Sequence, residues 1–395
     1  MSAIALANKI LKLGGIQLSR SGQTAKSKGI TLLPLGASQG RVLLAYVLEP
    51  LRDFNLPPGT DHTHNLESRL MASTWLERGY TVDAIDYRNQ TFVPARNYDF
   101  FVGARVHFDT IAGRLNASCV KIVHLDTSHY AVNNRDAWQR LVACRDRRGV
   151  SIPGSIRIIE SNRGMEAADH AVLLGNATTA QTYAYAGKPL HLLDVPAVVD
   201  LPFADRKDFE RARGQFIWLG SGGVLHKGLD LVLEAFAGMA DLRLVICGAI
   251  DTEPDFVAAY DRELALPNIV QHGWIDVAGE DFARLTEESV ALVYPSCREG
   301  QAGAVVNCMR AGLIPLVSRE SGVDVNAFGA CFEDSSVASV RDSVRWVASM
   351  AASDLRARAR ATWDFAASRF TPRAYLTRYG EIVNSITGAA KVAAA

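Results

Sequence analysis

The segment ALVYPSCREGQAGAVVNCMRAGLIPLVS (291–318) decides the fold of the second half of the chain. It opens with an apolar run typical of a buried strand, continues through a polar loop, and shows helical spacing from Ala302 to Ala311. A second apolar run, LIPLVS (313–318), follows the helix. A strand, a helix and a further strand in this order form a right-handed unit with parallel strands. We therefore predict a parallel sheet in this region.

The same alternation of strands and helices extends in both directions along the chain. Strands that alternate with helices of this length indicate parallel sheets covered by helices. We predict an α/β fold with two doubly wound, Rossmann-like parallel-sheet domains facing a central cleft. The predicted strands are 41–48, 81–86, 99–103, 119–124, 171–175, 190–194, 215–220, 242–248, 268–273, 291–295 and 313–318. The predicted helices are 65–77, 108–115, 135–148, 177–185, 229–239, 282–288, 302–311, 337–350 and 354–370.

The linker between the two domains is predicted within residues 194–214. This stretch contains two prolines and a charge run and lacks an apolar period. Pro372 suits the first turn of a helix, and the helix that it begins is expected to cross back to the first domain. The predicted units are a basic leader (1–29), an N-terminal Rossmann-like domain (30–200), a C-terminal Rossmann-like domain (205–371) and the final helix (372–388).

The composition excludes several classes of protein. The 395 residues carry 42 Lys and Arg against 42 Asp and Glu, whereas a nucleic-acid-binding domain is usually strongly basic. No run of apolar residues is long enough to span a membrane as a helix. The six cysteines include no CxxC pair, and most lie in apolar runs. We therefore expect a cytoplasmic protein without a disulfide framework or a zinc site.

The N-terminal leader is basic. The first acidic residue is Glu49, and Lys9, Lys12, Arg20, Lys26, Lys28 and Arg41 all precede it. A basic, mildly amphipathic segment is able to bind the anionic inner face of a membrane peripherally. The alternative is a solvated leader that makes no such contact. The sequence leaves both interpretations open.

The loop 296–301 is the first candidate for a ligand site. Two facing parallel domains place a ligand cleft at the C-terminal ends of their strands, and this loop follows such an end. The helix after it offers unpaired N–H groups suited to a phosphate, and Gly300 and Gly303 allow close approach. Glu299 is able to accept hydrogen bonds from sugar hydroxyls, and Asn307 lies on the same helix face as Gly303. Alternatively, Glu299 only stabilises the helix N-terminus.

The segment FIWLGSGGVLHKGLDLVLEAFAGM (216–239) is the second candidate. Lys227 follows a glycine-rich turn and enters a helix N-terminus, where a cation is unfavourable unless an anion binds there. The order Lys-Gly differs from a P-loop, and the turn breaks the GxGxxG pattern of dinucleotide-binding domains. The next strand ends in Cys247-Gly248, where such a domain has an acidic residue for the ribose. These departures argue against a dehydrogenase.

Both segments resemble retaining glycosyltransferases of the GT-B fold, and more narrowly the family-4 type, also called group 1. VYPSCREGQAGAVVNCMRAGLIPLVS (293–318) resembles the family segment PS..EG.G....EAMA.G.P.V, and FIWLGSGGVLHKGLDLVLEAF (216–236) resembles GR....KG.d.lleAf. The resemblance covers residues 215–320. It implies transfer of a sugar from a nucleotide-diphosphate sugar to a glycan or lipid-linked acceptor, with retention of configuration. It further implies a role in surface polysaccharide assembly, and no metal or cofactor apart from the donor substrate.

The resemblance also implies roles for individual residues. Glu299 would bind the donor sugar, Lys227 would neutralise the diphosphate, and the position of Trp274 would hold the base. His124, at the end of a first-domain strand, would orient the acceptor or the reacting sugar. The implied catalytic residues are thus Glu299, His124 and Lys227. The implied nucleotide-sugar-binding residues are Gly222, Gly223, Lys227, Trp274, Glu299, Gln301, Ala302, Gly303 and Asn307.

Two departures from the family pattern keep other functions open. Asn307 replaces the second glutamate of the family's pair, and Gly222 replaces its phosphate-binding arginine, whose charge His226 or another residue would have to supply. One alternative is a protein that binds a nucleotide sugar without transferring it. Another is a nucleotide-dependent oxidoreductase or epimerase. The pair His62 and His64 is expected to be a surface turn, since the sequence offers no third metal ligand at a suitable spacing and no DxD motif.

Overall fold

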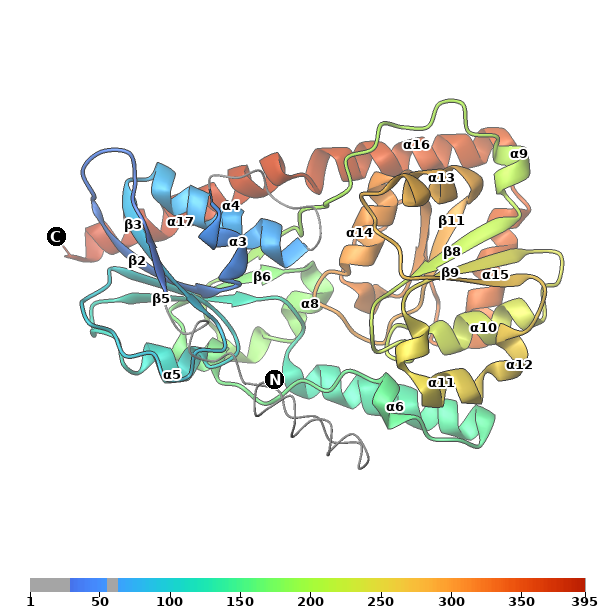
Figure 1. Cartoon of the computed structure of the whole chain (residues 1–395), viewed down its shortest axis with the longest axis horizontal. Coiled ribbons are helices and arrows are strands. Elements are labelled where there is room, and N and C mark those ends of the chain that lie inside the picture. The colour runs from blue at the N-terminus through green and yellow to red at the C-terminus, as the bar shows by residue number, and fades with distance from the viewer. Residues whose placement is uncertain (1–28, 55–62, 395) are drawn as a thin grey trace, which may run out of the picture.

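The computed structural model describes residues 29–54 and 63–394. The expectations for the basic leader up to residue 28 and for His62 therefore lie outside the described residues. Two sheets with their covering helices lie side by side along the long axis of the molecule (Figure 1). Among the described residues, no helix has the length and apolar character needed to cross a bilayer.

The first sheet has seven strands in the order β1-β3-β2-β4-β5-β6-β7. All pairings are parallel except that of β1 with β3, which is antiparallel. The strands are β1 (Ile30–Leu32), β2 (Gly40–Tyr46), β3 (Tyr80–Asp86), β4 (Phe100–Ala104), β5 (Val120–Leu125), β6 (His170–Leu174) and β7 (Leu190–Leu193).

The second sheet has six strands in the order β10-β9-β8-β11-β12-β13, and every pairing is parallel. The predicted α/β fold with two doubly wound sheets is thereby confirmed. The strands are β8 (Gln215–Leu219), β9 (Arg243–Cys247), β10 (Ile269–Gly273), β11 (Ala291–Tyr294), β12 (Ile314–Val317) and β13 (Ala330–Cys331).

Helices cover both sheets. In the first half they are α3 (Glu49–Arg52), α4 (Thr63–Glu77), α5 (Phe108–Ala112), α6 (Tyr130–Arg148), α7 (Gly164–Ala167) and α8 (Ala177–Gln181). In the second half they are α9 (Phe209–Ala212), α10 (Leu229–Ala237), α11 (Pro254–Ala259), α12 (Asp261–Leu264), α13 (Glu280–Glu288), α14 (Gly303–Arg310), α15 (Val337–Ala348), α16 (Ala352–Arg369) and α17 (Pro372–Ala394).

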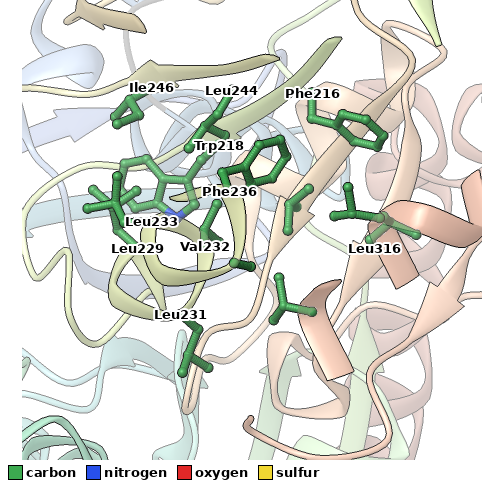
Figure 2. Close-up of a cluster of buried hydrophobic side chains, with 14 of the residues drawn as sticks. Phe216, Trp218, Leu229, Leu231, Val232, Leu233, Phe236, Leu244, Ile246 and Leu316 are labelled. Atoms are coloured by element: carbon green, nitrogen blue, oxygen red, sulfur yellow. The ribbon is translucent and has the colours of Figure 1, made fainter. Parts of the chain in front are cut away.

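The core of the second domain fixes the backbone next to Lys227. The apolar face of α10 packs on the central strands, where Phe236 lies against Phe216 with ring centroids 5.7 Å apart and Val232 belongs to the same cluster (Figure 2). Trp218 is fully buried in the same cluster. Its indole N–H donates a hydrogen bond of 3.2 Å to the carbonyl of Lys227. Since a buried indole N–H needs a partner, the core and the turn before α10 stabilise each other.

Two helices connect the two halves of the molecule. α17 returns to the first domain, where Tyr375 and Tyr379 pack in the core beside Trp75. α6 follows a first-domain strand but extends along the second domain, below α10 and α11 in the view of Figure 1, and its Leu141 and Cys144 belong to the second-domain core. The two domains therefore share apolar surface as well as a linker.

Buried charges reinforce the contact of α6 with the second domain. The carboxylate of Asp230, fully buried on α10, accepts hydrogen bonds from Arg140 at 3.1 Å and from Arg147 at 2.5 Å. The guanidinium of Arg140 also donates to the carbonyl of Pro295 at 2.9 Å. Arg148 pairs with Glu263 at 2.6 Å. These pairs hold the basic end of α6 on the second domain.

We expect Asp230→Ala to lower the free energy of unfolding by about 3–5 kcal/mol, because it leaves the buried Arg140 without its carboxylate. Thermal unfolding followed by circular dichroism measures the change. Asp146→Ala is the matched control, since Asp146 is exposed and pairs with the neighbouring, exposed Arg145. An equal fall in the two variants would contradict the stabilising role of the Asp230 pairs.

Candidate active site

The loop after β11 is held between the two domains by its backbone. The hydroxyl of Ser128 donates to the carbonyl of Glu299 at 2.6 Å, and the hydroxyl of Thr179 donates to the carbonyl of Gly300 at 2.7 Å. A Cβ on Gly300 would lie 2.5 Å from the carbonyl oxygen of Asp126, so only glycine allows this approach. The first domain thus fixes the residue that carries the candidate carboxylate.

The Glu299 side chain is buried and charged. Its Oε1 accepts a hydrogen bond from the Tyr294 hydroxyl at 3.0 Å, and its Oε2 lies 3.4 Å from Nη1 of Arg157. Burial raises the pKa of this carboxyl, but the charges of Arg157 and Lys227 outweigh burial and hold the pKa below its usual value. The carboxylate is therefore an acceptor for hydroxyl groups at neutral pH.

Lys227 enters the same site from the turn before α10. Its Nζ donates to the Ser221 hydroxyl at 2.7 Å, and the side chain is buried. Burial lowers the pKa of Lys227 to about 8, although the charge of Glu299 opposes the shift. Gly228 has a φ of 78°, and a Cβ there would lie 2.2 Å from the carbonyl oxygen of Pro295. The Lys-Gly order therefore brings this turn into backbone contact with the Glu299 loop.

The glycine-rich turn at Gly222 and Gly223 already holds a carboxylate of the protein. Gly223 has a φ of 80°, in the left-handed region that glycine favours. Glu253, after β9, accepts hydrogen bonds from the backbone N–H of Gly223 at 2.6 Å and of Val224 at 3.2 Å. A ligand phosphate would have to displace Glu253 to use these two N–H groups.

The start of α14 is partly engaged within the protein. The N–H of Ala302 donates to the carbonyl of Ser321 at 2.9 Å. The side chain of Gln301 bonds to the N–H of Val195 at 2.6 Å and to the Asp194 carboxylate at 2.8 Å. Gly303 begins the helix. The predicted phosphate cradle therefore coincides with the anchor of the domain linker.

Asn307 also anchors the linker. Its Oδ1 accepts hydrogen bonds from the N–H groups of Val198 at 3.0 Å and Val199 at 3.2 Å, while its Nδ2 donates to the Gly303 carbonyl at 3.0 Å. A carboxylate in this place could not donate to the carbonyl. The amide at this position thus suits a bridge between α14 and the linker.

The other predicted residues occupy different parts of the molecule. His124 is the penultimate residue of β5 and is fully buried, with Nε2 3.8 Å from the Glu67 carboxylate and its ring edge-on to Tyr46. Among the described residues, neither ring nitrogen has a hydrogen-bond partner. Trp274 follows β10 and is 72% exposed. Because β9 and β8 lie between β10 and β11, Trp274 stands toward the other edge of this sheet from the Glu299 loop.

His226 does not supply the charge that Gly222 lacks. Its Nε2 lies 2.6 Å from the carbonyl of Arg298 and its Nδ1 lies 3.3 Å from Sγ of Cys297. Burial lowers the pKa of His226 to about 4, which leaves the ring neutral at physiological pH. Arg157 instead places a guanidinium in the site. No sequence pattern indicated Arg157, because it lies far from both motifs along the chain.

Comparison with known proteins identifies the second domain. Residues 213–350 match the family of glycosyl transferases group 1. The C-terminal domain is a group 1 glycosyltransferase domain. The match covers both motifs, with Lys227 and Glu299, and ends before α16. No curated protein matches the chain.

Solved structures share the fold of this group 1 domain and of the domain before it. α,α-Trehalose 6-phosphate synthase from Burkholderia multivorans has a TM-score of 0.60 at 10% identity, with 91% of this chain and 99% of that chain covered. Anabaena HepE, in complex with UDP and glucose, has a TM-score of 0.57 at 10% identity, with 88% and 100% covered. WaaG, a glycosyltransferase of lipopolysaccharide biosynthesis, has a TM-score of 0.53 at 14% identity, with 87% and 99% covered.

These likenesses extend over both sheets, and the chain has the GT-B arrangement of two Rossmann-like domains. The chain spans only about half of two longer matches, 54% of Staphylococcus aureus TarM and 57% of pneumococcal GtfA. Their TM-scores are 0.48 and 0.47.

We expect Asn307→Ala to destabilise the protein by about 1–3 kcal/mol, because the linker loses the acceptor for two N–H groups. The midpoint of thermal unfolding measures this loss. Asn384→Ala is the control, since Asn384 accepts a single exposed hydrogen bond from Arg78. If Asn307→Ala unfolded at the temperature of the parent, the anchoring role of the amide would be wrong.

Proposed function

We propose that the protein transfers a sugar from a nucleotide-diphosphate sugar to a glycan or lipid-linked acceptor, with retention of configuration and without a metal. The observation that carries the proposal is the meeting of two buried, opposite charges that interact, those of Glu299 and Lys227, at the strand ends of a group 1 domain. Charged groups with shifted pKa values that meet at such a position are typical of functional sites.

The chemistry follows from the two charges. As the bond between sugar and diphosphate breaks, negative charge grows on the leaving diphosphate. The Lys227 ammonium is fixed by Ser221 and lies in a buried site, so it stabilises that charge more than it stabilises the bound donor. The Glu299 carboxylate accepts hydrogen bonds from the donor sugar and fixes its orientation. Contact between the two domains excludes water that would hydrolyse the donor.

The acceptor is proposed to bind on the first domain. His124 lies near the end of β5, two residues before Asp126, whose backbone touches the Glu299 loop. A cavity of about 340 Å³ lies beyond the ends of β4 and β5, and polar groups line it, as suits a polyhydroxylated acceptor. Its polar lining residues include His107, Asp109, Tyr130, Glu160, Asn162 and Arg163.

We propose the base of the donor nucleotide and the pathway from the proteins of similar fold. HepE, whose fold is similar, holds UDP and glucose, so a uridine diphosphate sugar is the first donor to test. The exposed indole of Trp274 offers a surface on which a base could stack. WaaG acts in lipopolysaccharide biosynthesis, which agrees with a role in surface polysaccharide or glycolipid assembly.

A second candidate is a protein that binds a nucleotide sugar without transferring it. Two observations favour it. Glu253 occupies the N–H groups of the glycine-rich turn, and Asn307 is engaged with the linker instead of facing the cleft. Binding without turnover over a panel of donors and acceptors would support this candidate.

We expect Lys227→Ala and Glu299→Ala each to lower the rate of sugar transfer by about 10²–10³-fold, because each removes a charge placed for the transition state. Donor consumption with UDP-sugars and a glycan panel measures the rate in the absence of metal. Glu287→Ala, on α13 outside the site, is the control. Transfer at the parental rate in both variants would contradict the proposal.

We expect the affinity for a nucleoside diphosphate to fall as the pH rises above about 8, because the Lys227 pKa is about 8 and its ammonium form attracts the diphosphate. Calorimetric titration between pH 7 and pH 9.5 measures how steeply the affinity falls with pH. The Lys227→Gln variant carries no charge at this position, so its affinity should depend less on pH. An equal pH dependence of the affinity in the parent and in Lys227→Gln would assign this dependence to another group.

A further inference from the structure

We propose that Arg157, from the first half of the chain, is the second cation of the donor site and binds the donor diphosphate through its guanidinium. The inference rests on the proposed function, since it concerns the same site. It assigns the charge missing at Gly222 to a residue outside both sequence motifs.

The backbone of Arg157 is fixed against the second domain. Its carbonyl accepts a hydrogen bond of 2.9 Å from Nδ2 of Asn133 on α6. Two residues earlier, the carbonyl of Ser155 accepts the N–H of His226 at 3.1 Å. Ile152 and Ile156 are buried in the second-domain core. Arg157 therefore belongs to the rigid surroundings of the site although it precedes the linker.

The side chain of Arg157 lies between the two motifs. A Cβ on Gly223 would lie 2.6 Å from its Cγ, so the stem of the side chain packs against the glycine-rich turn. At its other end Nη1 lies 3.4 Å from Oε2 of Glu299. Substituting Gly223 would displace the arginine as well as strain the backbone. The guanidinium thus meets the turn before Lys227 and the loop of Glu299 together.

The charges of the site require a further cation. Four charged side chains interact around Lys227, namely the cations of Lys227 and Arg157 and the carboxylates of Glu299 and Glu253. The carboxylate of Asp126 also acts on Arg157, but it is paired with Arg105 at 2.9 Å, so the two leave the sum unchanged. Without Arg157 the remaining three sum to one negative charge, which would repel a diphosphate. With Arg157 the sum is zero. Because His226 is neutral, it does not change this balance.

The geometry leaves Arg157 free to move to a ligand. Its side chain is 50% exposed, and among the described residues Glu299 is the only hydrogen-bond partner of its guanidinium. That contact is long for a hydrogen bond, at 3.4 Å, so charge attraction and not a well-formed hydrogen bond holds the guanidinium beside Glu299. A guanidinium has five N–H donors in a planar fork that fits phosphate oxygens in pairs. As Arg157 turns to the diphosphate, Glu299 is released to accept hydroxyl groups of the sugar.

The test compares affinities for UDP and for uridine by calorimetric titration, with GDP, ADP and TDP and their nucleosides used in the same way. We expect Arg157→Gln to weaken binding of the diphosphate at least tenfold and to change binding of the nucleoside less than twofold. Arg157→Lys keeps the charge without the planar fork of donors, so its affinity for the diphosphate should lie between those of the parent and Arg157→Gln. Arg145→Gln is the matched control, since Arg145 is exposed on α6 and pairs with Asp146.

The outcomes separate this inference from the proposed function. If Lys227→Ala weakens diphosphate binding and Arg157→Gln leaves it unchanged, the inference is overturned while the proposed function stands. If the parent protein binds none of the diphosphates, both fail. A thermal midpoint near that of the parent shows that the Arg157→Gln variant is folded. If Arg157→Gln does not fold, the Arg157→Lys variant provides the test. An affinity of Arg157→Lys for the diphosphate equal to that of the parent would contradict the need for the paired N–H donors of arginine.

Discussion

Backbone contact between the Glu299 loop and its two neighbours is the constraint on which the site depends. Gly300 touches the carbonyl of Asp126 on one side, and Gly228 touches the carbonyl of Pro295 on the other. Both approaches are shorter than a Cβ would tolerate, so glycine is required at both positions. The loop is therefore held at once by the first domain and by the turn that carries Lys227. Two opposite charges from different strand ends are brought together in this way.

Burying the charges of Glu299 and Lys227 costs free energy, so a gain in stability does not explain why they are buried. Burial alone shifts both pKa values toward the neutral forms. The charges of Arg157 and Lys227 counteract this shift for Glu299, and the charge of Glu299 counteracts it for Lys227. Paired charges of this kind are often no more stabilising than apolar side chains of the same size. Their presence at the ends of parallel strands agrees with a role in binding an anionic sugar donor. The neutral His226 beside them serves the loop structure instead.

The sequence predicted the central strands because each is a continuous apolar run. β1 and β13 escaped prediction, since they have three and two residues and are not fully buried. Lys227 and Glu299 were predicted from their places after strands, and the structure brings their motifs together. Arg157 was beyond prediction, because its contacts arise only when α6 packs along the second domain. The engagement of Asn307 with the linker likewise depends on a contact between distant segments, which no local pattern reveals.

Hydrogen–deuterium exchange of the full chain, with and without UDP or the diphosphate that binds, tests the central claim most directly. The account predicts slower exchange in three separate segments, residues 153–159, 219–228 and 296–304, because the ligand would bridge all of them. Protection confined to the first sheet would place the ligand elsewhere. Unchanged exchange in the three segments at saturating diphosphate would contradict the account.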